Sequence, residues 1–179
     1  MFEAEIKFVA EAAFVPAGTA LAPELCRDVY YDRPDGSLAA SGRELRLRER
    51  GGAAVLTFKS PPFDAATASK EEIETSVADG AAMAKILEAL GYAPFAAYAK
   101  RLRRFCDAYR GLGLEIAVVT VDFAPETFVE IEHLAATRAH ALAALPAIRA
   151  YAAALGLSRE CPRAYTDMLL AARRTGWAG

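Results

Sequence analysis

The sequence has little of what several classes of protein require. Its three cysteines, Cys26, Cys106 and Cys161, are odd in number, far apart and without a Cys-x-x-Cys spacing, so neither a disulfide framework nor a zinc knuckle fits. The two histidines, His133 and His140, lack the His-Glu-x-x-His context of a two-histidine metal site. We interpret the cysteines as small apolar core residues.

An excess of positive charge and a long apolar segment are also lacking. The chain has 21 basic and 23 acidic residues, so no overall basic field draws it to nucleic acid. Its most apolar stretch, Ala139–Leu157, is mostly alanine and is interrupted by Pro146 and Arg149, which favours a helix of a globular protein over a membrane span. The N-terminus carries acids where a signal peptide needs a basic start. We therefore expect a cytoplasmic protein with no membrane or nucleic-acid partner.

Apolar residues suffice for one large core. Hydrophobic residues make up 54% of the 179 residues and charged residues 25%, as is ordinary for a globular protein. No internal repeat or low-complexity linker divides the chain, and its length favours one domain over two very small ones. We predict a single domain over residues 1–179.

Sequence periodicity predicts an α+β protein with a mostly antiparallel sheet. Alternation with period two predicts eight strands, with approximate ranges Phe2–Val9, Val29–Tyr31, Glu44–Arg50, Val55–Lys59, Glu71–Val77, Tyr98–Tyr109, Leu114–Asp122 and Phe128–Leu134. Helices are predicted for Thr19–Cys26, Asp79–Leu90, Arg138–Leu155 with a kink at Pro146, and Arg163–Arg173. Evenly spaced strands joined by short turns suggest a closed or nearly closed β-barrel with helices packed outside.

The non-apolar face of the predicted strands carries almost only glutamate, arginine and lysine. Side chains two residues apart in a strand point to the same face. The cations on this face are Lys7, Arg46, Arg48, Lys59, Arg101 and Arg103, and the acids are Glu3, Glu5, Glu72, Glu74, Glu130 and Glu132, with Asp122 as a seventh. A solvated outer face of a half-buried sheet is the alternative interpretation, but such faces usually include threonine, serine and glutamine.

Charges of both signs on one face indicate a site for phosphate and a hard cation. Arginine binds phosphate through two parallel hydrogen bonds. So many carboxylates would repel a polyanion unless they held Mg²⁺ or Mn²⁺. The combination predicts a metal-dependent phosphoryl or nucleotidyl site. A tripolyphosphate needs several cations along its length, which a barrel interior can supply from many strands.

A series of short motifs occurs along the chain, most of them in the predicted strands that carry these charged residues. The segments are Glu3–Lys7, Tyr30–Asp32, Leu45–Arg48, Leu56–Lys59, Glu72–Glu74 and Phe128–Glu132, followed by Leu155–Leu157 and Pro162–Tyr165. Their types and order resemble the CYTH superfamily, the triphosphate tunnel metalloenzymes, and the last two segments resemble its class IV adenylate cyclase branch. The resemblance implies an eight-stranded antiparallel β-barrel that encloses a charged tunnel.

The resemblance also implies roles for individual residues. It implies that the catalytic residues are Lys7, Glu72, Glu74 and Arg103. It implies that the triphosphate is bound by Lys7, Arg46, Arg48, Lys59, Arg101 and Arg103. It implies that Mg²⁺ or Mn²⁺ is bound by Glu3, Glu5, Asp122, Glu130 and Glu132. The family has Lys-x-Arg where this chain has Lys100–Arg104, and period two favours Arg101 and Arg103 for the tunnel face. Ala124–Thr127 replaces the usual Leu-Gly turn after Asp122.

Two reactions and two other functions remain open at this point. Members of the family cyclise ATP to cyclic AMP or hydrolyse triphosphates such as thiamine triphosphate and tripolyphosphate, and length, Tyr30–Asp32 and the tail near Tyr165 favour the cyclase. A non-catalytic polyphosphate or nucleotide sensor is disfavoured because every acidic position is retained. RNA binding is disfavoured because the chain has no excess of basic residues and no set of aromatic side chains on which bases could stack. The oligomeric state stays open, with a homodimer as one expected assembly.

Overall fold

Strands contain more residues than helices in the described part of the chain. The computed structural model describes residues 1–174, and in these it places all eight predicted strands and a short ninth. They are β1 (Phe2–Ala10), β2 (Thr19–Ala20), β3 (Glu24–Asp32), β4 (Glu44–Arg50), β5 (Ala53–Lys59), β6 (Lys70–Val77), β7 (Ala93–Tyr109), β8 (Leu112–Val121) and β9 (Ala124–Ala135).

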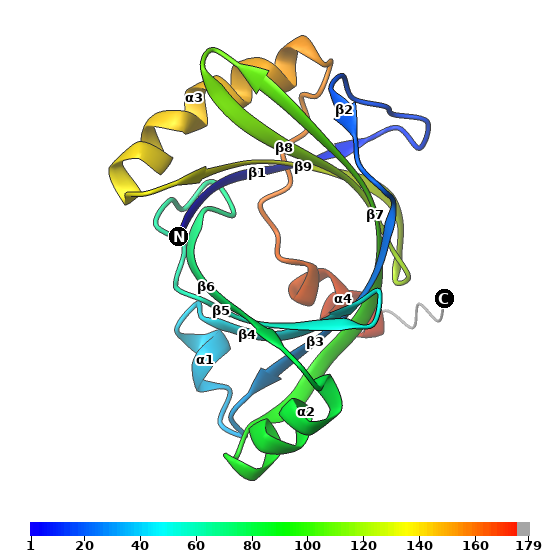
Figure 1. The fold of residues 1–179 in the computed structure, drawn as a ribbon, viewed down its shortest axis with the longest axis vertical. Helices are drawn as coiled ribbons and strands as arrows, with labels where there is room; N and C mark the ends of the chain where they lie inside the picture. Colours follow the sequence, from blue (N-terminus) through cyan, green and yellow to red (C-terminus); the bar gives the residue numbers. More distant parts are fainter. Residues whose placement is uncertain (175–179) are drawn as a thin grey trace.

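Eight of these strands close into a ring, as the sequence predicts. The order is β7-β3-β4-β5-β6-β1-β9-β8, β8 pairs back to β7, and neighbouring strands are antiparallel (Figure 1). β2 is added at the edge of β7. The shortest pairing joins β1 to β6, where only Phe2 opposite Glu71 and Glu3 opposite Lys70 are in register. The barrel is therefore closed, with its weakest seam between β1 and β6.

The helix predicted over Thr19–Cys26 is wrong. This segment forms β2 and the start of β3, both paired with β7. Its side chains alternate, since Leu25 is 58% exposed and Cys26 is fully buried. Pairing with the long β7 strand overrides a weak local preference for helix, as tertiary context often does.

Four helices are present in the described residues, and their ends follow local sequence signals. They are α1 (Ser37–Ala40), α2 (Gly80–Ala89), α3 (Arg138–Ala154, with Pro146 inside it) and α4 (Tyr165–Arg174). The side chain of Asp79 caps α2 by accepting a hydrogen bond of 2.9 Å from the Ala82 amide, and Thr137 caps α3 in the same way. No helix in this part of the chain is long and apolar enough to span a membrane.

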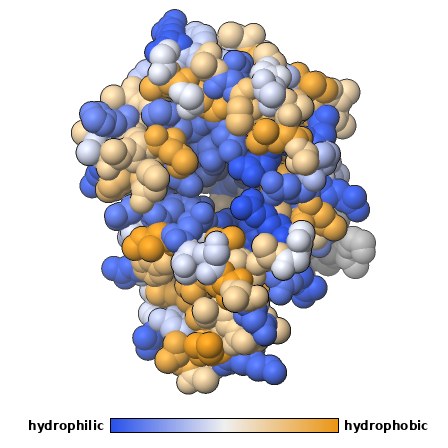
Figure 2. Space-filling view, in the orientation of Figure 1, coloured by the Kyte–Doolittle hydropathy of each residue, from blue (hydrophilic) through white to orange (hydrophobic). Residues whose placement is uncertain are grey.

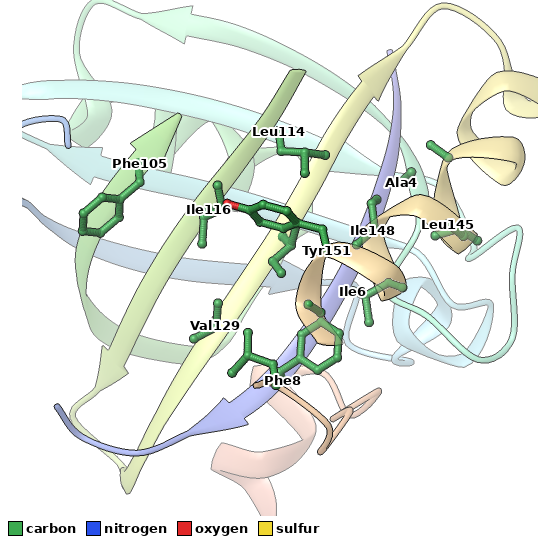
Figure 3. Packing of buried hydrophobic residues seen from close by; sticks show 14 of the residues in the cluster. Ala4, Ile6, Phe8, Phe105, Leu114, Ile116, Val129, Leu145, Ile148 and Tyr151 are labelled. Carbon is green, nitrogen blue, oxygen red and sulfur yellow. The ribbon is translucent and has the colours of Figure 1, made fainter. Parts of the chain in front are cut away.

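Two apolar clusters lie outside the ring, and a third, which includes Tyr30, Leu102 and Tyr165, lies inside it at the end covered by α4. In β1, Ala4, Ile6 and Phe8 are each at most 2% exposed and pack under α3, whose Ile148 and Tyr151 face them (Figure 3). α2 covers a second cluster on the outer face of β4 and β5. In β1 the alternation therefore sends the apolar side chains outward to α3 and the charged side chains Glu3, Glu5 and Lys7 into the barrel.

α4 differs from α2 and α3 in its position. The segment before it crosses one end of the barrel, where the Cys161 amide donates a hydrogen bond of 2.7 Å to the Lys7 carbonyl. Tyr165 and Leu170 of α4 face the barrel interior, and in Figure 1 α4 lies within the outline of the ring. This helix covers one end of the barrel, whereas α2 and α3 cover its sides.

Candidate active site in the barrel interior

The barrel encloses a charged cavity of about 560 Å³. Figure 2 shows it as a hollow near the centre of the molecule with hydrophilic walls. Ten of the thirteen predicted site residues line it, and they are Glu3, Glu5, Lys7, Arg46, Arg48, Lys59, Glu72, Glu74, Glu130 and Glu132. The structure thus brings together residues that are up to 129 positions apart in sequence (Glu3 and Glu132).

The structure corrects the prediction for β7. Arg101 and Arg103 are exposed on the outer face, and Arg103 donates a hydrogen bond of 2.8 Å to the Phe14 carbonyl. Lys100 and Arg104 line the cavity instead. The reason is the β7–β8 register, because Phe105, opposite Ile116, packs beneath α3 and the alternation then turns Arg103 and Arg101 outward as well.

Asp122 also lies away from the predicted metal ligands. It is exposed in the turn between β8 and β9, and its carboxylate accepts a hydrogen bond of 3.0 Å from the Ala99 amide. It does not line the cavity. The turn consists of Asp122 and Phe123, and Ala124–Thr127 already belongs to β9, so this carboxylate lies on the outside of the barrel.

Three of the predicted metal ligands form a compact cluster. One carboxylate oxygen from each of Glu3, Glu5 and Glu132 lies within 4.8 Å of the other two. Glu3 and Glu5 alternate along β1, and Glu5 is directly opposite Glu132 on β9. Burial raises the pKa of all three carboxyl groups, and neighbouring carboxylates raise them further. Oxygen donors that repel one another in this way suit a hard divalent cation.

Glu130 has different partners from this cluster. Its carboxylate lies 3.2 Å from Lys100 Nζ. Burial would raise the pKa of Glu130, but the charges of Lys100 and Lys7 outweigh burial and lower it. The structure therefore brings together the carboxylates of Glu3, Glu5 and Glu132 and places Glu130 in an ion pair with Lys100.

Most cavity cations are paired with an acid. Arg48 contacts Asp28 at 2.6 Å, and Lys59 pairs with Glu72. Burial alone would raise the pKa of Glu72, but the charge of Lys59 helps to lower this pKa to about 2. Lys70 pairs with Glu44, and Arg104 pairs with Glu115 and Glu24. A ligand that binds these cations must therefore compete with carboxylates or bring a metal ion that engages them.

Arg46 and Lys7 are less completely paired. Arg46 donates to Thr57 Oγ1 at 3.0 Å and to Glu74 at 3.3 Å, but its Nε is buried without a hydrogen-bond partner. Lys7 Nζ donates to the Arg163 carbonyl and lies 4.1 Å from the centre of the Tyr165 ring. Among the described residues, Arg46 Nε and Lys7 Nζ therefore have no carboxylate partner that a ligand would have to displace.

Several residues that line the cavity are not among the site residues predicted from the sequence, and for Lys100 the prediction favoured its neighbours Arg101 and Arg103. Lys100, Arg104, Glu44, Lys70, Glu24, Glu115 and Tyr165 all line the cavity. The i, i+2 pattern that identified Arg46 and Arg48 also relates Glu44 to them, so this residue could have been found. The alternation of side chains in strands could not place Tyr165 in the cavity, because Tyr165 enters the cavity from a helix.

Part of the Tyr30–Asp32 motif has a structural role. The Asp32 carboxylate accepts hydrogen bonds of 2.9 Å from the Leu38 and Ala39 amides and so holds the loop that carries α1. Tyr30 lines the cavity, and its hydroxyl accepts a hydrogen bond of 3.1 Å from the Tyr98 hydroxyl.

Comparison with known proteins agrees with this architecture. A candidate adenylate cyclase of Methanocaldococcus jannaschii is 25% identical over 95 residues, which are 53% of this chain and 52% of that protein, so the match spans about half of each. Among solved structures, a candidate adenylate cyclase of Vibrio parahaemolyticus superposes with a TM-score of 0.80 at 21% identity, covering 95% of this chain and 98% of that one.

A plant protein has the same fold. HpAC1 of Hippeastrum, a candidate adenylyl cyclase described as having a dominant triphosphatase activity, superposes with a TM-score of 0.64 at 18% identity, covering 100% of this chain and 98% of that one. The model of the CYTH domain family matches residues 1–165, nearly the whole sequence. This chain belongs to the CYTH domain family.

Proposed function

We propose that the protein is a metal-dependent enzyme that acts on a triphosphate held inside the barrel. The observation that carries the proposal is the cluster of Glu3, Glu5 and Glu132 in a cavity that also contains Arg46, whose Nε has no hydrogen-bond partner in residues 1–174, and Lys7, which donates to a carbonyl and not to a carboxylate. Carboxylates alone would repel a triphosphate, whereas carboxylates with a bound cation attract one.

The residues of the cluster fit Mg²⁺ or Mn²⁺. All three donors are carboxylate oxygens, which these ions prefer, and the group contains no sulfur or nitrogen donor. When bound, such an ion neutralises phosphate oxygens and orients the triphosphate. Glu3, Glu5 and Glu132 would hold it, and Glu130 would hold Lys100 beside it.

The cations would bind the phosphates. Lys7, Arg46, Arg48, Lys59 and Lys100 line the cavity, and Lys100 takes the part expected of Arg101 and Arg103. Together they would neutralise the negative charge that develops on the leaving phosphate oxygens. Glu72 and Glu74 would orient Lys59 and Arg46, with which they pair.

Cyclisation of ATP is the reaction that we favour. In it, the ribose 3′-hydroxyl oxygen bonds to the α-phosphorus, the bond from that phosphorus to the bridging oxygen breaks, and pyrophosphate leaves. The names of the relatives from Methanocaldococcus and Vibrio support cyclisation. The activity described for the Hippeastrum protein supports the alternative, in which water attacks the terminal phosphate of ATP, thiamine triphosphate or tripolyphosphate.

One experiment separates these reactions. The protein is incubated with Mg²⁺ or Mn²⁺ and each of ATP, thiamine triphosphate and tripolyphosphate, and the products are identified by mass. Cyclic AMP with pyrophosphate identifies the cyclase, and inorganic phosphate identifies the hydrolase. Unchanged substrate together with measurable binding would instead indicate a polyphosphate or nucleotide sensor.

A further inference from the structure

One buried carboxylate beside the cavity has no role in the proposed reaction. Asp28 lies on β3 directly opposite Arg48 on β4, and its side chain is 0% exposed. It does not line the cavity, whereas Arg48 does. Asp28 therefore makes no direct contact with a ligand in the cavity, whereas Arg48 can.

Arg48 is held by both oxygens of this carboxylate. Its Nε lies 2.6 Å from Asp28 Oδ1 and its Nη2 lies 2.7 Å from Asp28 Oδ2. Two parallel hydrogen bonds fix the plane of the guanidinium as well as its position. They leave both hydrogens of Nη1 and one hydrogen of Nη2 available on a side chain that is 17% exposed.

The neighbouring Arg46 is held differently. It shares one oxygen of Glu74, whose side chain is 49% exposed, at 3.3 Å. Water or a phosphate can compete for such a contact at little cost. A carboxylate with no exposed surface cannot be rehydrated in the same way, so separating Asp28 from Arg48 would leave a buried charge unpaired.

We propose that Asp28 is a positioning residue that orients Arg48 so that its Nη1 end is presented to the triphosphate. This inference rests on the proposed function, because it requires Arg48 to bind phosphate. On binding, Arg48 keeps its two hydrogen bonds to Asp28 and adds new ones through Nη1. The ligand therefore meets an arginine whose side-chain freedom has already been lost, which reduces the entropy cost of binding.

The charges around Asp28 agree with this role. Burial would raise its pKa, but the hydrogen bonds and charge of Arg48, with the charges of Arg46 and Lys100, lower it to about 2. Asp28 is thus an anion at neutral pH and offsets the repulsion among these three cations.

The direct test is Asp28→Asn, which keeps the shape of the side chain and removes its charge and one acceptor. Binding of tripolyphosphate with Mg²⁺ is measured by calorimetry, and folding is checked by thermal melting. We expect the dissociation constant to rise roughly ten- to a hundredfold, the range for losing a hydrogen bond to a charged group. The matched control is Asp107→Asn, because Asp107 accepts a 2.7 Å hydrogen bond from Tyr151 away from the cavity. The control should bind as the unaltered protein does.

A double-mutant cycle separates positioning from general stabilisation of the fold. If Asp28 acts through Arg48, Asp28→Asn should change the dissociation constant less than about twofold in a chain that already carries Arg48→Met. An equal loss in both backgrounds would overturn the proposal. Unchanged binding in Asp28→Asn alone would do the same.

A measurement on the unaltered protein covers the case in which Asp28→Asn does not fold. The Nε–H resonance of Arg48, assigned with Arg48→Lys, should be protected from solvent exchange before and after addition of Mg²⁺ and tripolyphosphate. Loss of protection on binding would show that the ligand replaces Asp28, against the proposal. If the unaltered protein binds no tripolyphosphate with Mg²⁺, the proposed function itself fails, and this inference fails with it.

Discussion

At the residue scale, the unpaired Nε of Arg46 supports the proposal that the cavity binds an anion. This donor is buried without a partner, and an unpaired buried donor costs about 1–3 kcal/mol. The neighbouring acid, Glu74, already accepts a hydrogen bond of 2.7 Å from Thr57. A phosphate oxygen would accept the hydrogen bond that no group of the described residues accepts from Arg46 Nε.

Arg46→Lys should therefore weaken binding although it keeps the positive charge. A lysine loses the planar pair of donors that matches phosphate, so we expect a loss of about 1.5–3 kcal/mol in binding of tripolyphosphate with Mg²⁺, measured by calorimetry. Arg101→Lys, on the outer face of β7, is the matched control. Equal affinity in the two variants would remove Arg46 from the phosphate site.

Glu132→Gln should impair use of the metal ion. The change removes one charged ligand from the cluster and leaves the side chain nearly the same size. We expect activity to require a much higher Mg²⁺ concentration, or to be lost, while the protein stays folded by circular dichroism. Glu126→Gln, which is exposed on the same strand, serves as the control. Full activity of either protein in excess chelator would contradict metal dependence.

Asp28 should make the protein sensitive to acid. Its pKa in the folded protein is lowered from 3.8 to about 2 because hydrogen bonds and charge from Arg48 outweigh burial. A lowered carboxyl pKa contributes stability that is fully present above about pH 4 and is lost as the pH falls towards 2. The free energy of unfolding, measured by urea titration from pH 5 to pH 2, should fall less steeply in Asp28→Asn. Parallel pH profiles would exclude this role for the ion pair.

At the scale of the element, α3 supports the barrel wall without entering the cavity. Ile148 is 0% exposed and packs on the outer side of β1. Ile148→Ala should lower the free energy of unfolding by about 2–5 kcal/mol through lost burial and a residual cavity. Affinity for tripolyphosphate with Mg²⁺ should change little in the folded variant. The neighbouring Arg149→Ala removes only a partly exposed pair with Glu160, and it should cost well under 1 kcal/mol by the same measurement.

Elements with one clear pattern were predictable from the sequence, and elements with two competing patterns were not. β1 has an apolar and a charged face, and α2 has Asp79 as a cap and Gly91 after its end, so both were placed within a residue or two. β7 carries arginine on both faces, so alternation alone could not select the inner one. That choice depends on its register with β8 and on burial under α3, which are interactions between distant parts of the chain.

For the whole molecule, metal and triphosphate should stabilise the fold together more than the sum of each alone. Like charges crowd the empty interior, and a cation that contacts both carboxylates and phosphates relieves repulsion on both sides. A ligand at a hundredfold excess over its dissociation constant adds roughly 2.7 kcal/mol, which implies a rise in melting temperature of roughly 5–10 °C for a chain of this size. Strictly additive shifts in a thermal melt at saturating Mg²⁺ and tripolyphosphate would argue against a shared site.

The order of strands around the barrel has a consequence for how the chain folds. β1 is made first, yet nearly all its pairing is with β9, from Phe2 opposite Ala135 to Ala10 opposite Thr127. Pairing between segments so distant in sequence is slow, because a long stretch of chain must be ordered before the pairing is gained. During synthesis, Glu3 and Glu5 therefore remain apart from Glu132 until almost the whole barrel has left the ribosome. Closure of the barrel and assembly of the cluster of Glu3, Glu5 and Glu132 are then one event, and a nascent chain does not have the complete cluster before it.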